Sequence, residues 1–112
     1  MTAQIMDPIK ENIEKFSFIP KVLIIDDEDR IQRACQRLLK EEGCEVHLAD
    51  DGVNGLAMLD EHHFDIILLD LMMPGISGLD VLPQVKTRHP DTVVIVVTGY
   101  ATIEHSLAAM KK

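Results

Sequence analysis

Short apolar runs alternate with stretches of helical periodicity, and this alternation constrains the fold more than any other feature of the sequence. Three of the runs, 22–25, 66–69 and 93–97, contain no polar residue, whereas 46–49 is mixed. Strands without polar alternation are typical of sheets that are buried on both faces. Helical spacing of apolar residues or helix-start signals follow each run, at 30–40, from Val53, from Ser77 and at 103–110.

This order predicts an α/β fold in which right-handed crossovers connect parallel strands and helices cover both faces. We therefore expect a flavodoxin-like, doubly wound parallel sheet. The sequence ends at Lys112 before any fifth strand, so the predicted fold is truncated after the fourth β-α unit, with the fifth strand and helix absent. The run 93–97 would then form an unprotected apolar edge, which predicts self-association of the chain.

Residues 1–20 differ from the rest and are predicted to form an N-terminal leader segment, with the domain proper at 21–112. Asp7 and Pro8 are typical of a helix start, and Ile9, Ile13 and Phe16 follow at helical spacing. We expect a short helix that packs on the domain. Folded back, it could cover part of the gap that the missing elements leave.

Acidic residues follow two of the predicted strands. Asp26, Asp27 and Glu28 follow the first strand and Asp70 follows the third, while Thr98 follows the fourth. The carboxyl ends of parallel strands form one edge of the sheet, and the first and third strands are neighbours in the flavodoxin-like order. A single strand-end Asp is usually a turn or cap residue. Three aspartates from two adjacent strands instead indicate a site.

Carboxylates at close range repel one another, so such a cluster requires a cation or raised pKa values. Oxygen ligands with room for water suit Mg²⁺ best. Beside that ion, Asp70 could act as a nucleophile toward a phosphoryl group and form an acyl phosphate. The Thr98 hydroxyl could bond a phosphoryl oxygen.

Three segments carry a family resemblance. Residues 24–28 resemble the acidic turn of response-regulator receiver domains of two-component signalling, 70–78 their phosphorylation loop, and 98–102 their switch loop. The switch loop is most similar to that of the nitrogen-regulatory, sigma-54-dependent class. The resemblance covers 21–112.

The resemblance implies that Asp70 accepts a phosphoryl group from a sensor histidine kinase, in a signalling domain rather than an enzyme. It implies direct Mg²⁺ binding by Asp27, Asp70 and the backbone carbonyl of Met72, with Asp26 acting through a water and Thr98 as the switch hydroxyl. It also implies an output domain, DNA-binding or ATPase, in the parent protein. The family's lysine, which follows a fifth strand, has no counterpart here, and Lys111 and Lys112 are not assigned that role.

Three alternatives stay open at this point. A haloacid-dehalogenase-type phosphatase also uses a strand-end Asp and Mg²⁺, but it requires a second Asp at position 72, where this chain has Met. A flavin-binding module needs a glycine- and hydroxyl-rich loop after the first strand, and the acidic loop here would repel phosphate. A receiver-like interaction module that is not phosphorylated is the third alternative.

Charge and hydropathy exclude several other classes. The formal net charge is -8 with no basic stripe, which argues against direct nucleic-acid binding. No apolar run is long enough to span a bilayer and no signal peptide is evident, so we expect a cytoplasmic location and no membrane partner. Cys35 and Cys44 match no zinc spacing, and we expect two reduced thiols.

Overall fold

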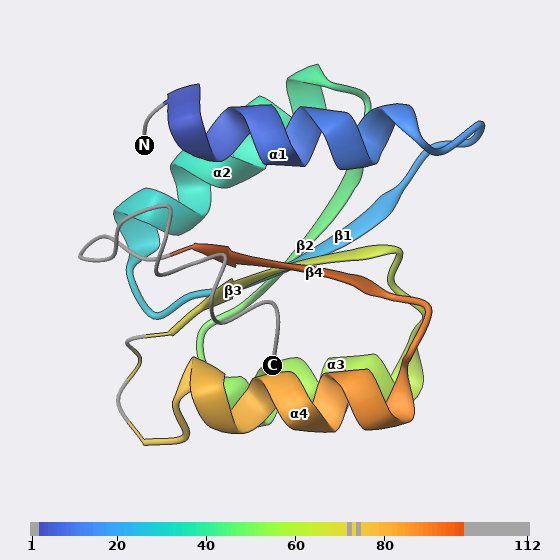
Figure 1. The fold of residues 1–112 in the computed structure, drawn as a ribbon. Coiled ribbons are helices and arrows are strands. Elements are labelled where there is room, and N and C mark those ends of the chain that lie inside the picture. The colour runs from blue at the N-terminus through green and yellow to red at the C-terminus, as the bar shows by residue number, and fades with distance from the viewer. Residues whose placement is uncertain (1–2, 72, 74, 98–112) are drawn as a thin grey trace.

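The described residues form a four-stranded parallel sheet with helices on both faces (Figure 1). The computed structural model describes residues 3–71, 73 and 75–97. The elements run in the order α1 (Ala3–Glu14), β1 (Lys21–Ile25), α2 (Asp29–Glu41), β2 (Glu45–Ala49), α3 (Gly52–Glu61), β3 (Ile66–Asp70), α4 (Gly78–Arg88) and β4 (Val93–Val97). The predicted α/β class and the parallel sheet are confirmed, whereas the helix expected at 103–110 lies outside the described residues.

The strand order β2-β1-β3-β4 places β1 and β3 side by side in the sheet, as the flavodoxin-like order requires. Their parallel register pairs Val22 with Ile66 and Ile25 with Leu69. Because side chains alternate along a strand, each central strand contributes side chains to two separate apolar cores. Both strands are buried along almost their whole length, which explains why their sequences lack polar alternation.

The sheet separates α1 and α2 on one side from α3 and α4 on the other (Figure 1), and a separate apolar core lies on each face. On one face, Leu23, Ile25, Ile67 and Leu69 pack with side chains of α3 and α4. On the other face, their strand neighbours Val22, Ile24, Ile66 and Leu68 pack with side chains of α1 and α2. Helices thus pack on both faces of the sheet, and the loops that follow β1 and β3 start from its carboxyl end.

Local signals define the helix ends. Gly43 adopts a positive φ of 88° just beyond α2, where a side chain would be strained. At the start of α4, the Asp80 carboxylate accepts hydrogen bonds from the Ser77 amide at 3.2 Å and the Ser77 hydroxyl at 3.1 Å. This pair forms a capping box at the start of α4. Pro83 lies inside α4 without ending it.

The leader helix α1 lies on the same side of the sheet as α2 and packs against β4 (Figure 1). Ile9 is buried, Ile13 and Phe16 are partly buried against the same core, and Lys10 forms a 3.5 Å ion pair with Glu42 at the end of α2. The helix begins at Ala3, so the predicted start at Asp7 is wrong. The preceding residues 3–6 include Ala, Gln and Met, whose helix propensity is high and outweighs the one bond that Pro8 removes.

None of the helices in the described part of the chain has the length and apolar character needed to cross a membrane.

Candidate functional site

An acidic cluster lies at the carboxyl ends of β1 and β3. Asp26 and Asp27 directly follow β1, and Asp70 is the last residue of β3. Because Ile25 pairs with Leu69, the next residues on the two strands face each other across the sheet edge. Each of the three aspartates offers a carboxylate oxygen within 4.8 Å of the others. The structure therefore brings together the three carboxylates that the sequence predicted would converge.

The three carboxylates differ in their exposure. Asp26 and Asp70 are only 4% and 8% exposed, whereas Asp27 is exposed. Burial, together with the neighbouring carboxylates of Asp70 and Asp27, raises the pKa of Asp26 to about 7. A hydrogen bond from the Glu28 amide to Asp26 Oδ1, 2.8 Å long, opposes this rise in the pKa. At neutral pH the cluster consequently favours taking up a proton or a cation.

The donor set fits Mg²⁺. Among the described residues it consists of carboxylate oxygens, which hard divalent cations prefer, and the exposure of Asp27 leaves the cluster open to water on one side. Mg²⁺ usually binds through one or two carboxylates and keeps several waters, and this arrangement allows both. Within the part of the chain that the structure describes, the cluster contains no sulfur or imidazole ligand, unlike a typical zinc site.

The loop after Asp70 folds back on the end of β3. A Cβ atom at Gly78 would clash with the Asp70 carbonyl oxygen and lie 2.7 Å from Leu71 Cα, so only glycine allows this approach. Leu71 and Met73 are buried, which anchors the first half of the loop. Met72 and Thr98, the predicted carbonyl ligand and switch hydroxyl, lie outside the described residues. Those two assignments stay predictions.

Gln32 is a residue that the sequence analysis missed. It lies in the first turns of α2, is only 4% exposed, and directs its side-chain amide to the backbone at the ends of β1 and β2. The available signal was its position on the apolar face of the helix, since Gln32, Cys35 and Leu39 follow one another at helical spacing. A lone amide on such a face indicates a buried hydrogen-bond partner.

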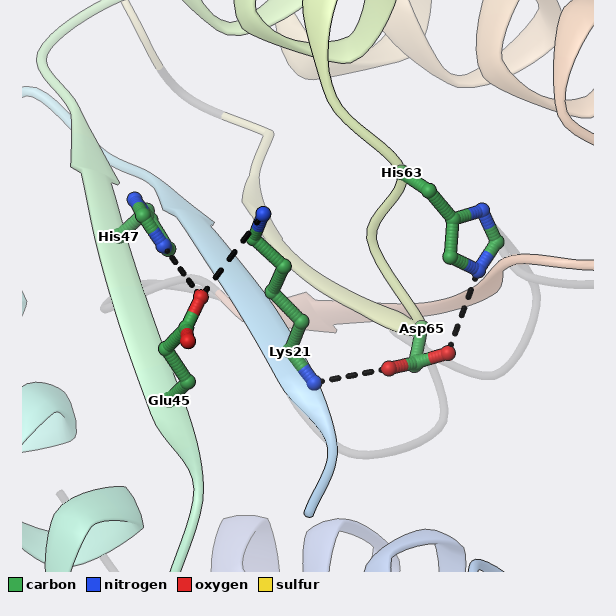
Figure 2. Close-up of polar contacts among 5 residues, drawn as sticks. All are labelled: Lys21, Glu45, His47, His63 and Asp65. Atoms are coloured by element: carbon green, nitrogen blue, oxygen red, sulfur yellow. Dashed lines mark hydrogen bonds and ion pairs between the residues drawn. The ribbon is translucent and has the colours of Figure 1, made fainter. Parts of the chain in front are cut away.

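A second polar cluster lies at the opposite end of the sheet (Figure 2). The backbone N–H of Lys21 donates to Asp65 at 2.8 Å, and its ammonium lies 3.8 Å from Glu45. Imidazole nitrogens of His47 and His63 lie 2.8 Å and 3.2 Å from the carboxylates of Glu45 and Asp65. The hydrogen bond from His47, with the nearby Lys21 charge, lowers the pKa of Glu45. Here each carboxylate has a donor or a cation beside it.

Comparisons with known proteins point to one family. The family model described as the response regulator receiver domain matches residues 22–112. The regulatory protein AtoC of Escherichia coli is 32% identical over 93 residues, which make up 83% of this chain and 20% of AtoC. The chain thus spans about a fifth of that relative's length.

Solved structures agree on the same fold. TrrA from Thermotoga maritima, in complex with Mg(2+)-BeF, is 32% identical with a TM-score of 0.74, over 81% of this chain and 79% of TrrA. NtrX from Brucella abortus, in complex with ATP, is 28% identical with a TM-score of 0.76, over 84% of this chain and 22% of NtrX.

Proposed function

This chain belongs to the response regulator receiver domain family, and from that premise we propose that Asp70 is its phosphoacceptor. The observation that carries the proposal is the convergence of Asp70 with Asp26 and Asp27, each with an oxygen within 4.8 Å of the others, at the ends of adjacent strands. The donor would be the phosphohistidine of a sensor histidine kinase. An Asp70 oxygen attacks phosphorus, the P–N bond breaks, and the imidazole leaves, so that an acyl phosphate remains on Asp70.

The residues proposed to hold Mg²⁺ are Asp27 and Asp70 directly, the backbone carbonyl of Met72, and Asp26 through a water. When bound, the ion would neutralise charge on the transferring phosphoryl group. The burial of Asp26 and Asp70 supports this assignment, because buried carboxylates at this distance need a positive partner when both are ionised. Asp27 is exposed, so its carboxylate is the first that can replace a water molecule of an arriving hydrated ion.

Thr98 is proposed as the switch hydroxyl. The register of the sheet supports this, because Asp70 pairs with Val97, the residue that precedes Thr98. A hydroxyl that follows the phosphoryl group would give the phosphorylated state a contact that the free state lacks, as a population shift requires. Spectral changes on activation that are the same in wild type and Thr98→Ala would remove Thr98 from the switch.

The finer class and the partners are also proposals. The similarity to AtoC and NtrX supports a place in the nitrogen-regulatory, sigma-54-dependent class, with an ATPase or DNA-binding output domain in the parent protein and a cytoplasmic location. We further propose that 1–20 form a leader segment added to a receiver domain at 21–112, because the family model begins only at residue 22.

We also propose that the chain self-associates through β4. Helix α1 packs against β4 and should reduce this self-association. Light scattering at micromolar concentration, with and without residues 1–20, tests the proposal. A compact monomer in both cases, with unchanged cooperative unfolding, would contradict both self-association and the covering role of α1.

Phosphorylation of the natural full-length protein tests the main proposal. With acetyl phosphate or a partner kinase and Mg²⁺, borohydride trapping and mass spectrometry should locate the label on Asp70. Asp70→Asn removes the nucleophile and should abolish the label, whereas Asp65→Asn, at the other end of the sheet, should retain it. Label that persists in Asp70→Asn would sink the assignment, and wild-type protein that takes no label would favour an interaction module instead.

A further inference from the structure

We propose that Gln32 is a positioning residue for the acidic cluster, an inference that rests on the proposed function of that cluster. Gln32 touches neither the phosphoryl group nor the ion in this proposal. It acts through the backbone of the turn that carries Asp26 and Asp27. The observations behind it are its burial, its hydrogen bonds and the course of the chain around it.

The side-chain amide of Gln32 joins three parts of the molecule. Its Nε2 lies 3.2 Å from the Asp26 carbonyl oxygen, 3.1 Å from the Ala49 carbonyl oxygen and 3.3 Å from Asp50 Oδ1. The amide has two N–H groups, so three acceptors share two donors. The end of β1, the end of β2 and the first turns of α2 therefore meet at one side chain.

Gln32 meets the acidic turn at both of its ends, through its side chain at one end and through the first backbone hydrogen bond of α2 at the other. Its side chain donates to the carbonyl of Asp26, and its backbone N–H donates to the carbonyl of Glu28 at 3.0 Å. The Asp26 carbonyl begins the peptide bond to Asp27, so its orientation determines where the Asp27 side chain starts. The Asp26 amide also donates to Ala49 at 3.1 Å, and that carbonyl is one of the Gln32 acceptors.

Repulsion among the three aspartates explains why the acidic turn needs hydrogen bonds that fix its position. Asp26, Asp27 and Asp70 repel one another when ionised, and the turn that carries two of them would relax away from the cluster unless it were fixed. An apolar residue at position 32 would suit the buried face of α2 equally well for packing. A buried amide is retained at a position like this when its donors are used, because unpaired polar groups are unfavourable there.

The test compares Gln32→Met, similar in size but without N–H donors, with wild type in the full protein. In metal-free protein, the Asp26 amide should exchange with solvent faster, because its hydrogen bond to Ala49 loses support. The Mg²⁺ affinity, measured from the amide resonances of Asp27 and Asp70, should fall by about 10-fold, as for other groups that orient metal ligands. Gln32→Arg keeps N–H donors in reach and should restore the affinity to within about threefold of wild type.

Two controls separate positioning from general stability. Gln36→Met makes the same change one turn later in α2, and Leu39→Val loosens the core contact of the same helix. Both should keep the Mg²⁺ affinity within about twofold of wild type, although Leu39→Val lowers the unfolding midpoint. An equal loss of affinity in Leu39→Val would overturn the proposal, because general destabilisation would then explain it.

Unchanged exchange and affinity in Gln32→Met would also overturn it. If Gln32→Met does not fold, Gln32→Asn takes its place, since its amide is one methylene too short to span the three acceptors, and the same outcomes decide. Wild-type protein that binds no Mg²⁺ would refute the proposed function. In that case the exchange rate of the Asp26 amide alone decides whether Gln32 positions the turn, so the two failures are distinguishable.

Discussion

The carboxylates at the two ends of the sheet have different neighbours. At the carboxyl end, three aspartates gather with their oxygens within 4.8 Å of one another. At the amino end, Glu45 and Asp65 each lie beside a donor or cation supplied by Lys21, His47 or His63 (Figure 2). The same central strand, β1, connects both clusters. The amino end thus places cations and donors beside its carboxylates, whereas the carboxyl end gathers three carboxylates at the site proposed for a cation and a phosphoryl group.

Removing a carboxylate should therefore have different effects at the two ends of the sheet. The largest difference is expected in Mg²⁺ binding. Asp27→Ala removes a proposed direct ligand and should abolish Mg²⁺ binding, while Asp26→Ala, which removes a proposed water-mediated contact, should only weaken it. Glu45→Ala at the amino end should leave the titration unchanged. Calorimetric or amide-shift titrations measure all three, and equal curves for wild type and Asp27→Ala would place the ion elsewhere.

The stability of the metal-free protein gives the next contrast. Asp26 has a folded-state pKa of about 7, above its ordinary value of 3.8. Between pH 3.8 and about pH 7, Asp26 is therefore protonated in the folded state and ionised in the unfolded state. The free energy of unfolding falls as pH rises through this range. Asp26→Asn removes the ionisable group and keeps an acceptor for the Glu28 amide. Above pH 7 it should be more stable than wild type by about 2 kcal/mol, since the cluster is partly open to water.

Urea unfolding at pH 5 and pH 8, with and without Mg²⁺, measures this effect. The advantage of Asp26→Asn should be smaller at pH 5, because wild-type Asp26 is then largely protonated in the folded state. Saturating Mg²⁺ should reduce the advantage at pH 8, because the ion stabilises the wild-type cluster. An Asp26→Asn protein less stable than wild type at pH 8 without Mg²⁺ would show that the cluster is not under electrostatic strain.

Much of this contrast could be predicted from the sequence, though not all of it. The central strands are apolar on both faces, so their burial and parallel pairing followed from the pattern. The convergence of Asp26, Asp27 and Asp70 followed once the flavodoxin-like strand order was assumed. The amino-end pairs could not be foreseen, because the contact between Lys21 and Glu45 depends on the register of β1 with β2. Gln32 was missed for a related reason, since its acceptors are backbone carbonyls that carry no sequence signal.

The start of α1 shows the opposite error. Asp7 and Pro8 form a recognised local signal, yet the helix begins at Ala3, because a weak local preference gives way to a run of good helix formers. Local start signals are thus less reliable than the burial pattern of a whole strand.

The smallest expected effect lies at the amino end, where losing a carboxylate should lower stability instead of raising it. Asp65 Oδ2 accepts the Lys21 amide at 2.8 Å, and the Asp65 side chain is only 11% exposed. Asp65→Ala leaves that amide without its acceptor and should reduce the free energy of unfolding by about 1 kcal/mol. Asp65→Asn keeps an acceptor oxygen and should recover most of this loss.

Glu45→Gln is the matched control at this end. Its carboxylate is solvent-exposed, and exposed ion pairs contribute little to stability, so the unfolding midpoint should stay at the wild-type value. Urea unfolding of the three variants at pH 8 compares them directly with Asp26→Asn. If Asp65→Ala proved as stable as wild type, or more stable, carboxylates at both ends would be dispensable for folding. The division between a charge-matched and a charge-strained end of the sheet would then fail.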